Sequence, residues 1–406
     1  MKTRSAITVL FVLALAAIAP ENAAAEEVAS APAQAVEPWS PWAESKLGVP
    51  FQIDGYFWTD TGYLDRNNTQ SGAYDSGQNY MGGRLVVGAS YQRALGEYFA
   101  KARVQYLGLE NEFTNTSYEP HTLDAYLQVG SKLWDLQLGR FLASEVYYRG
   151  QGIELYTAEE AGALGGPSMY LLDLTRGHKN EAGQAAFHLR PASFLSFEVG
   201  SVYGRENNQN KRGVRPVVDF SLAGLKLIGG YEYFAERPLD DSNKVEATSK
   251  GYGGRMQYSF ARQGSAWLRA PAWVSYSEEA GKGWTGPVAT FGVDFAAVTV
   301  DATDINGLVD AEKTFDKTTV GAFADLDFWK NSLGAAYHQT TQENEQGEEI
   351  VQHQLSVSYL YRLPIPGLSV KAVYGFARAE LEDVDTGAEW ENDLQSFRVR
   401  LRYDFM

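Results

Sequence analysis

The chain has no cysteine among its 406 residues, and this absence excludes disulfide bonds and thiolate metal sites. Its histidines are few and show no metal-ligand spacing: His121, His178, His188, His338 and His353. The sequence also lacks the nucleophile-elbow, zinc-protease and phosphate-loop motifs of common enzymes. We therefore expect no cofactor, no metal and no enzymatic activity.

Long apolar runs are missing after the first 25 residues, so no later segment predicts a membrane helix. At the start, Lys2 and Arg4 precede a short apolar run, and Ala23, Ala24 and Ala25 resemble a signal-peptidase site. Residues 1–25 are therefore predicted to be a signal peptide. Residues 26–50, rich in Ala, Pro and Glu, are predicted to be a periplasmic lead-in without a core of its own.

What the sequence does contain is acid, glycine and aromatic side chains. The net charge of −16 argues against nucleic acid as a partner. The 40 Gly, 24 Tyr, 20 Phe and 9 Trp are typical of a large β structure. Strands that face lipid on one side alternate apolar and polar residues, so they escape a search for apolar runs.

Residues 51–406 form extended segments separated by turn signals, and the connections alternate in length. Short ones such as "ALGEY" and "WKNS" alternate with longer polar ones such as "ENEFTNTSYEP" and "NNQNKRGVR". Short turns on one rim and long loops on the other are typical of a transmembrane barrel. We predict an all-β, antiparallel, up-and-down barrel of about 18 strands, within a range of about 16 to 18. One of these strands contains Pro271, and separate strands are expected at "VATFGVDFA" and around Asp301.

Alternation along each strand also predicts which side chains face the lumen. A basic wall is expected from Arg84, Lys101, Arg103, Lys371, Arg398, Arg400 and Arg402, beside Gln52 and Asp54 of the first strand. An acidic wall is expected opposite, from Asp219, Asp294, Asp301, Asp325 and Asp327, with Glu198 and Glu232 and interrupted by Lys226. Opposed walls would set up a transverse field that orients solutes. Whether the arginines select solutes or only pair with carboxylates such as Asp54 stays open.

The last strand, "SFRVRLRYDFM", resembles the C-terminal assembly signal of bacterial outer-membrane proteins. Apolar residues alternate up to Tyr403 and Phe405, although Met406 follows where such chains usually end on the aromatic residue. The layout of the whole mature chain is similar to that of the porins. This resemblance implies the bacterial outer membrane, contact with its lipid, and recognition by the outer-membrane assembly machinery.

In porins the loop after the fifth strand folds into the lumen and forms a constriction. The corresponding segment here runs from Glu145 to about Lys179 and contains no clear strand. Carried over by resemblance, Glu159, Glu160 and Asp173 would be acidic groups at the constriction, and Tyr147, Tyr148, Arg149, Tyr170 and Arg176 would shape it. An ordinary surface loop is the alternative.

The function that follows is passive diffusion of ions and small hydrophilic solutes through a charged, loop-constricted channel. A second hypothesis is a pore that exports an extracellular polysaccharide together with a periplasmic partner. A third is a structural barrel plugged by the long loop. Homo-oligomers are usual among porins, but no residue of this sequence identifies a subunit interface.

Overall fold

The computed structural model describes residues 51–68, 77–111, 121–147, 170–179, 181–206, 208–222, 224–238, 246–263, 266–269, 287–303, 314–344, 347–382 and 389–405. The predicted signal peptide and lead-in lie outside these residues. Its strands are β1 (Gln52–Asn68), β2 (Gln78–Leu95), β3 (Tyr98–Asn111), β4 (His121–Ser131), β5 (Trp134–Arg140), β6 (Gly183–Ala192), β7 (Leu195–Glu206), β8 (Gln209–Leu222), β9 (Leu225–Pro238), β10 (Glu246–Gln263), β11 (Ala266–Arg269), β12 (Val288–Thr303), β13 (Phe315–Phe328), β14 (Asn331–Asn344), β15 (Glu349–Arg362), β16 (Leu368–Glu382) and β17 (Glu389–Phe405). No helix long and apolar enough to cross a membrane occurs in this described part.

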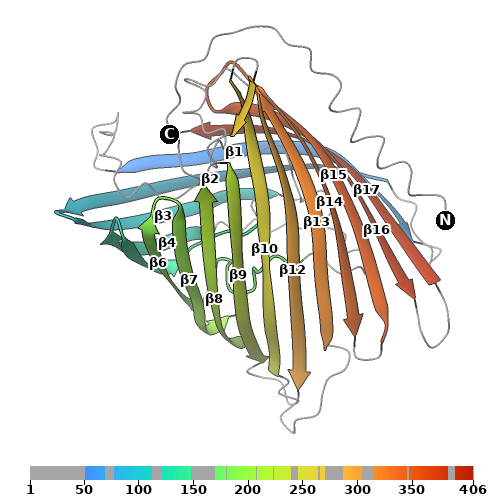
Figure 1. The fold of residues 1–406 in the computed structure, drawn as a ribbon, viewed down its shortest axis with the longest axis horizontal. Coiled ribbons are helices and arrows are strands. Elements are labelled where there is room, and N and C mark those ends of the chain that lie inside the picture. The colour runs from blue at the N-terminus through green and yellow to red at the C-terminus, as the bar shows by residue number, and fades with distance from the viewer. Residues whose placement is uncertain are drawn as a thin grey trace.

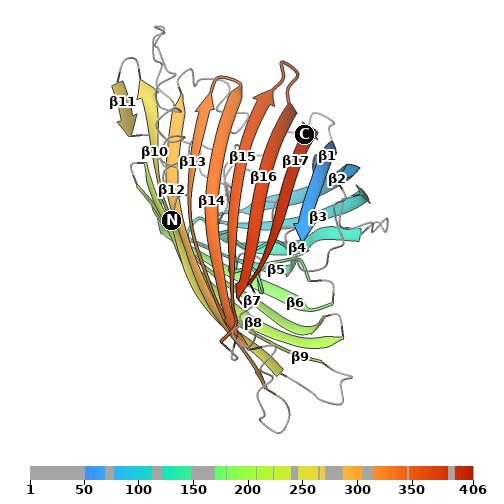
Figure 2. The same ribbon diagram turned by 90° about the vertical axis from the view of Figure 1, so that its right-hand side faces the viewer.

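Every strand pairs with its neighbour in antiparallel register, and the sheet closes where β1 pairs with β17 on one side and β2 on the other. Figures 1 and 2 show the sheet curving round until its first and last strands lie side by side. Within the described residues β11 pairs with the end of β10, while β10 pairs directly with β12 along most of its length, so the closed ring has 16 strands. The predicted up-and-down barrel is confirmed, with a count at the lower end of the predicted range.

The prediction of about 18 strands was wrong between residues 266 and 303. The segments at "VATFGVDFA" and around Asp301 form one strand, β12, because no turn residue interrupts them. Of the strand expected around Pro271, the described residues contain β11, and Pro271 itself lies outside them.

The connections differ between the two rims. The rim where β2 meets β3 has tight turns, such as the one at Gly96, whose φ of +67° suits glycine. The other rim carries the longer connections, but the predicted loop "NNQNKRGVR" is wrong. Most of it belongs to β8, and the turn from β7 is closed by Asn208 with φ +62°, a conformation that asparagine tolerates.

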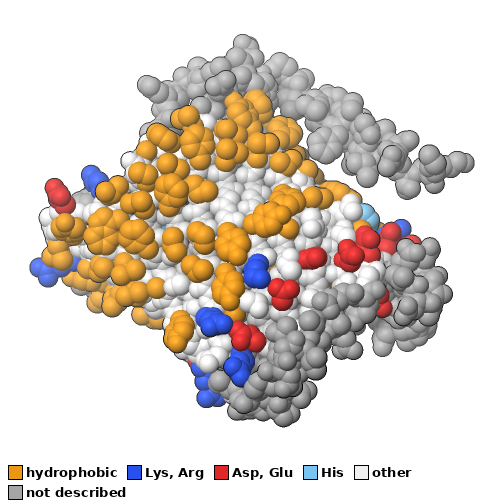
Figure 3. Space-filling view, turned by 60° about the horizontal axis from the view of Figure 1, so that its bottom comes forward, with side chains coloured by type: hydrophobic (Ala, Val, Ile, Leu, Met, Phe, Trp, Pro, Cys, Tyr) orange, Lys and Arg blue, Asp and Glu red, His pale blue; other side chains and the backbone are white. Residues whose placement is uncertain are grey.

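The outer surface of the barrel is apolar. Phe57, Val104, Leu127, Phe295 and Leu401 are between 40% and 63% exposed, and each alternates with side chains that point inward. Figure 3 shows hydrophobic side chains spread over much of this surface, with charged side chains at its left tip and in its lower and right-hand parts. A closed sheet satisfies its backbone hydrogen bonds internally, and an apolar exterior is what lipid requires.

Candidate channel lumen

The basic wall lies on five neighbouring strands, β16, β17, β1, β2 and β3. Strand alternation, read against the exposed apolar residues, places every predicted member on the inner face: Arg84, Lys101, Arg103, Lys371, Arg398, Arg400 and Arg402. The register brings members of different strands together. Lys371 lies directly opposite Arg400, and Arg84 lies opposite Trp58.

One buried carboxylate, Asp60 on β1, pairs with two arginines of β17. Arg400 donates to Asp60 Oδ2 over 2.9 Å, and Arg398 forms a second ion pair with the same oxygen. The Asp60 side chain is only 1% exposed. Arg400 also stacks on the ring of Trp58, 3.8 Å from its centroid, which is a cation–π contact. Both arginines are therefore held rigidly along the wall by one shared negative charge.

The other end members of the basic wall have their own partners. Arg402 pairs with Asp404 over 2.7 Å and lies 4.4 Å from the ring centroid of Tyr56. Arg103 makes a bidentate contact with Asp54, with its two terminal nitrogens 2.9 and 2.6 Å from the carboxylate oxygens. Lys101 lies 6.0 Å from the ring centroid of Tyr126.

Four of the five residues predicted for the acidic wall face inward, and cations accompany three of them. Asp219 pairs with Lys226 over 3.2 Å, and Asp327 lies 3.6 Å from Arg362. Asp294 accepts two hydrogen bonds from the Arg255 guanidinium, of 2.7 and 2.9 Å, and also contacts His338. Asp325 faces inward on β13 and is buried. This wall is therefore largely neutralised by its own ion pairs.

The prediction for Asp301 was wrong. It lies seven residues after Asp294 on the same strand, and an odd separation places two residues on opposite faces. Asp301 shares the outer face with Val293 and Phe295, and it pairs there with Lys250 over 3.4 Å. Treating β12 as two strands restarted the alternation and reversed the predicted direction of this side chain.

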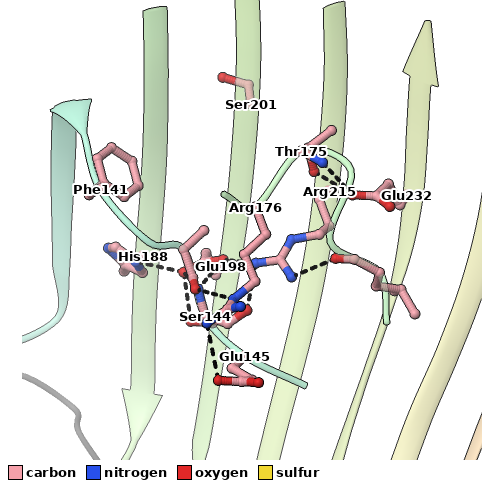
Figure 4. Close-up of polar contacts among 12 residues, drawn as sticks. Phe141, Ser144, Glu145, Thr175, Arg176, His188, Glu198, Ser201, Arg215 and Glu232 are labelled. Carbon is pink, nitrogen blue, oxygen red and sulfur yellow. Dashed lines mark hydrogen bonds and ion pairs between the residues drawn. The ribbon is translucent and has the colours of Figure 1, made fainter. Parts of the chain in front are cut away.

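The two described ends of the segment between β5 and β6, residues 141–147 and 170–179, lie inside the barrel against inner-wall residues, and we call this segment the entering segment (Figure 4). Tyr147 donates to the Phe295 carbonyl of β12 over 2.7 Å. Tyr170 donates to Glu232 Oε2 of β9 over 2.8 Å. Burial raises the pKa of the Tyr170 hydroxyl, and the adjacent carboxylate raises it further, so Tyr170 remains a neutral donor.

Of the remaining residues predicted for this segment, one joins its two ends, one is exposed, and the others lie outside the described residues. Arg176 pairs with Glu145 over 3.1 Å and donates to the Ala143 carbonyl over 2.9 Å, so it joins the two ends to each other. Asp173 is exposed beside it. Four predicted residues lie outside the described residues: Tyr148, Arg149, Glu159 and Glu160.

Sequence reasoning missed the residues that organise these contacts, chiefly Asp60, Trp58 and Arg215. A signal for the first two was present, because Asp54, Trp58 and Asp60 share the inner face of one strand. A signal for the entering segment was present too. Several inward positions on β8, β9, β10 and β12 are apolar or glycine where an aqueous lumen calls for polar residues: Val217, Ile228, Ala296, Val298, Gly213, Gly251 and Gly253.

Within the described ranges, no group of three or more His, Asp or Glu side chains is arranged to hold a metal ion. A closed sheet, an apolar exterior and a charged interior together define a membrane channel of the barrel class.

The family model of the Gram-negative porins matches residues 12–395, and the chain belongs to this family. It is a passive diffusion channel of the bacterial outer membrane. Comparison with curated proteins gave no match.

Several solved structures share the fold at low sequence identity. OmpT of Vibrio cholerae has a TM-score of 0.56 at 15% identity, covering 87% of this chain and 97% of that one. An anion-selective porin from Comamonas acidovorans has a TM-score of 0.57 at 10% identity, covering 87% and 99%. The outer-membrane channel DcaP of Acinetobacter baumannii has a TM-score of 0.52 at 11% identity, covering 89% and 99%.

Proposed function

We propose that solutes cross this channel along the basic wall and that the lumen prefers anions. The observation that carries this proposal is the sharing of Asp60 by Arg398 and Arg400, which leaves the group with more positive than negative charge. On the opposite wall, Glu198, Glu232 and Asp294 are engaged by arginine, by histidine or by the entering segment. A permeating ion therefore passes more basic than acidic side chains on this side of the lumen.

The entering segment narrows the lumen in this proposal. Its ends are fixed to the wall of β7 to β12, which leaves the basic wall as the side along which solutes move. The residues that would line the narrowest point include Arg176 and Asp173, together with Tyr148, Arg149, Glu159 and Glu160.

The remaining proposals concern processing and assembly. Residues 1–25 are proposed to be removed as a signal peptide, and residues 26–50 to form a periplasmic lead-in before the barrel of residues 51–406. The closing strand is proposed to be read by the outer-membrane assembly machinery. We propose a channel without enzymatic activity that forms a homo-oligomer, in keeping with a structurally similar OmpT that is described in a trimer form. Among the described residues, no lumen contact favours polysaccharide export over diffusion.

Reversal potentials across planar bilayers in a salt gradient test the proposed preference. Arg400→Gln should move the reversal potential toward cation preference, because it removes a lumen charge from β17. Arg378→Gln is the matched control, since Arg378 lies on the outer face of β16 and pairs with Asp393 over 2.8 Å. A cation preference in the unaltered protein, or equal shifts in both variants, would contradict the proposal.

A further inference from the structure

The two ends of the entering segment meet at one side chain of the wall, Arg215 on β8 (Figure 4). Its guanidinium donates to the Ser144 carbonyl over 2.6 Å and to the Leu172 carbonyl over 3.1 Å. Ser144 belongs to the outgoing end of the segment and Leu172 to the returning end. Arg215 therefore bonds to both ends at once, which its planar fork of donors permits.

The charge of Arg215 is balanced locally. Glu198 on β7 accepts from it over 3.0 Å, and the side chains of Arg215 and Glu198 are 0% and 4% exposed. The same carboxylate accepts from the Ser144 backbone N–H over 2.9 Å and from the Ser144 hydroxyl over 2.6 Å. His188 lies 3.0 Å from it on the other side. Removing one charged side chain from such a buried group leaves its partner as a buried charge without a counter-charge, which is strongly destabilising.

Glu232 on β9 completes the attachment of the returning end. Its carboxylate accepts from the Thr175 N–H over 2.8 Å and from the Thr175 hydroxyl over 2.6 Å, in addition to the bond from Tyr170. Glu198 and Glu232 thus receive donors from opposite ends of the segment. Arg215, on the strand between theirs, contacts both ends.

Apolar packing surrounds these polar contacts. Val146, Tyr147, Tyr170 and Leu172 of the segment form a buried cluster with wall residues Val217, Ile228, Ala296 and Val298. Leu172 is fully buried at φ +52°, a left-handed conformation that costs a leucine about 1–2 kcal/mol. Surrounding contacts must hold that conformation, and the bond from Arg215 to the Leu172 carbonyl is one of them.

We infer that Arg215 is the positioning residue that keeps the entering segment against the wall and so sets the open cross-section of the channel. The inference rests on the proposed function in one respect, namely that this segment narrows the conducting path. Without Arg215, the two ends lose their common donor and Glu198 loses its buried counter-charge. The docked and undocked arrangements then exchange, and the cross-section fluctuates.

Arg215→Met tests the inference because it keeps length and removes every donor. Loss of two charge-assisted hydrogen bonds should raise the population of current levels other than the main open level on the order of 100-fold. Arg215→Lys keeps the positive charge but loses the planar set of guanidinium donors. The population of current levels other than the main open level should therefore lie between those of the wild type and Arg215→Met. Arg215→Lys also tests the inference if Arg215→Met does not fold.

A reversible disulfide distinguishes a loss of segment positioning from general damage to the fold. A Cβ on Gly213 would overlap the Thr175 methyl group, so cysteines at both positions lie within the about 4 Å that a disulfide spans between Cβ atoms. The chain has no other cysteine. In the triple variant carrying Arg215→Met, Thr175→Cys and Gly213→Cys, oxidation should restore a single current level and reduction should abolish it. Wild-type current levels in folded Arg215→Met, or no response to oxidation, would overturn the inference.

A readout that does not depend on conductance keeps the two proposals distinct. Ala143→Cys places a single thiol at a position that is 7% exposed in the docked segment. Its reaction with a small thiol reagent should be about 100-fold faster when Arg215→Met is also present. A wild-type channel that does not conduct would refute the proposed function, whereas equal labelling rates would refute the role of Arg215.

Discussion

Replacing Asp60 by asparagine tests the charge arrangement of the lumen most directly. The substitution keeps the shape of the side chain and removes the single carboxylate that Arg398 and Arg400 share. Both arginines remain confined beside Trp58, with guanidinium carbons 5.6 and 3.8 Å from its ring centroid. The basic wall then gains one unit of net positive charge at a fixed place.

The size of the effect follows from the distance of closest passage. At about 6 Å in a water-filled lumen, one unit charge contributes about 0.7 kcal/mol to the energy of a monovalent ion. Screening at about 0.1 M salt reduces this to about 0.4 kcal/mol. The contribution is favourable for an anion and unfavourable for a cation, so the two effects add. The anion-to-cation permeability ratio should rise by about three- to fourfold.

The assay is the reversal potential in a tenfold potassium chloride gradient, measured on folded protein in planar bilayers. Asp393→Asn is the control, because it removes the same charge from a residue that pairs with Arg378 on the outer face. A smaller shift at higher salt should accompany the effect, since screening strengthens there. No shift in Asp60→Asn, or a shift toward cations, would refute the reasoning.

Three further predictions concern the docked segment and the outer face. Gly251→Val should destabilise docking by about 1–3 kcal/mol, because its Cβ would overlap the Tyr170 ring and hydroxyl; faster cleavage of the segment by added protease measures this. Glu232→Gln replaces one acceptor oxygen by a donor and should cost about 3 kcal/mol, seen as a lower temperature of heat-induced unfolding in detergent. Val293→Arg should cost about 2–4 kcal/mol of folding free energy in lipid bilayers, whereas Thr290→Arg on the inner face should cost much less.

The fold was predictable because its signal is repeated along the whole chain. Each strand alternates, and most turns on one rim contain residues suited to tight turns, as at Gly96. The errors arose where a strand boundary was predicted from a single local feature of the sequence. Residues 288–303 form one long strand without an internal turn. Dividing this strand into two in the prediction reversed the expected direction of the Asp301 side chain.

The candidate site was predictable only in part. Direction follows from alternation, so the inward face of Arg398, Arg400 and Arg402 could be read from the last strand alone. Pairing across strands depends on register, which no single strand contains. Asp60 and Arg398 are 338 residues apart in sequence, and only closure of the barrel brings them together.

The overall acidity of the chain does not determine the charge that a permeating ion meets. Carboxylates such as Glu198 and Glu232 are used to hold the entering segment, and each is surrounded by donors. Others, such as Asp301 and Asp393, lie on the outer face with basic partners. Because the field in the lumen depends on the charges near the path, the two arginines that share Asp60 outweigh paired acids that lie far from it. A net charge of −16 is thus compatible with an anion-preferring lumen.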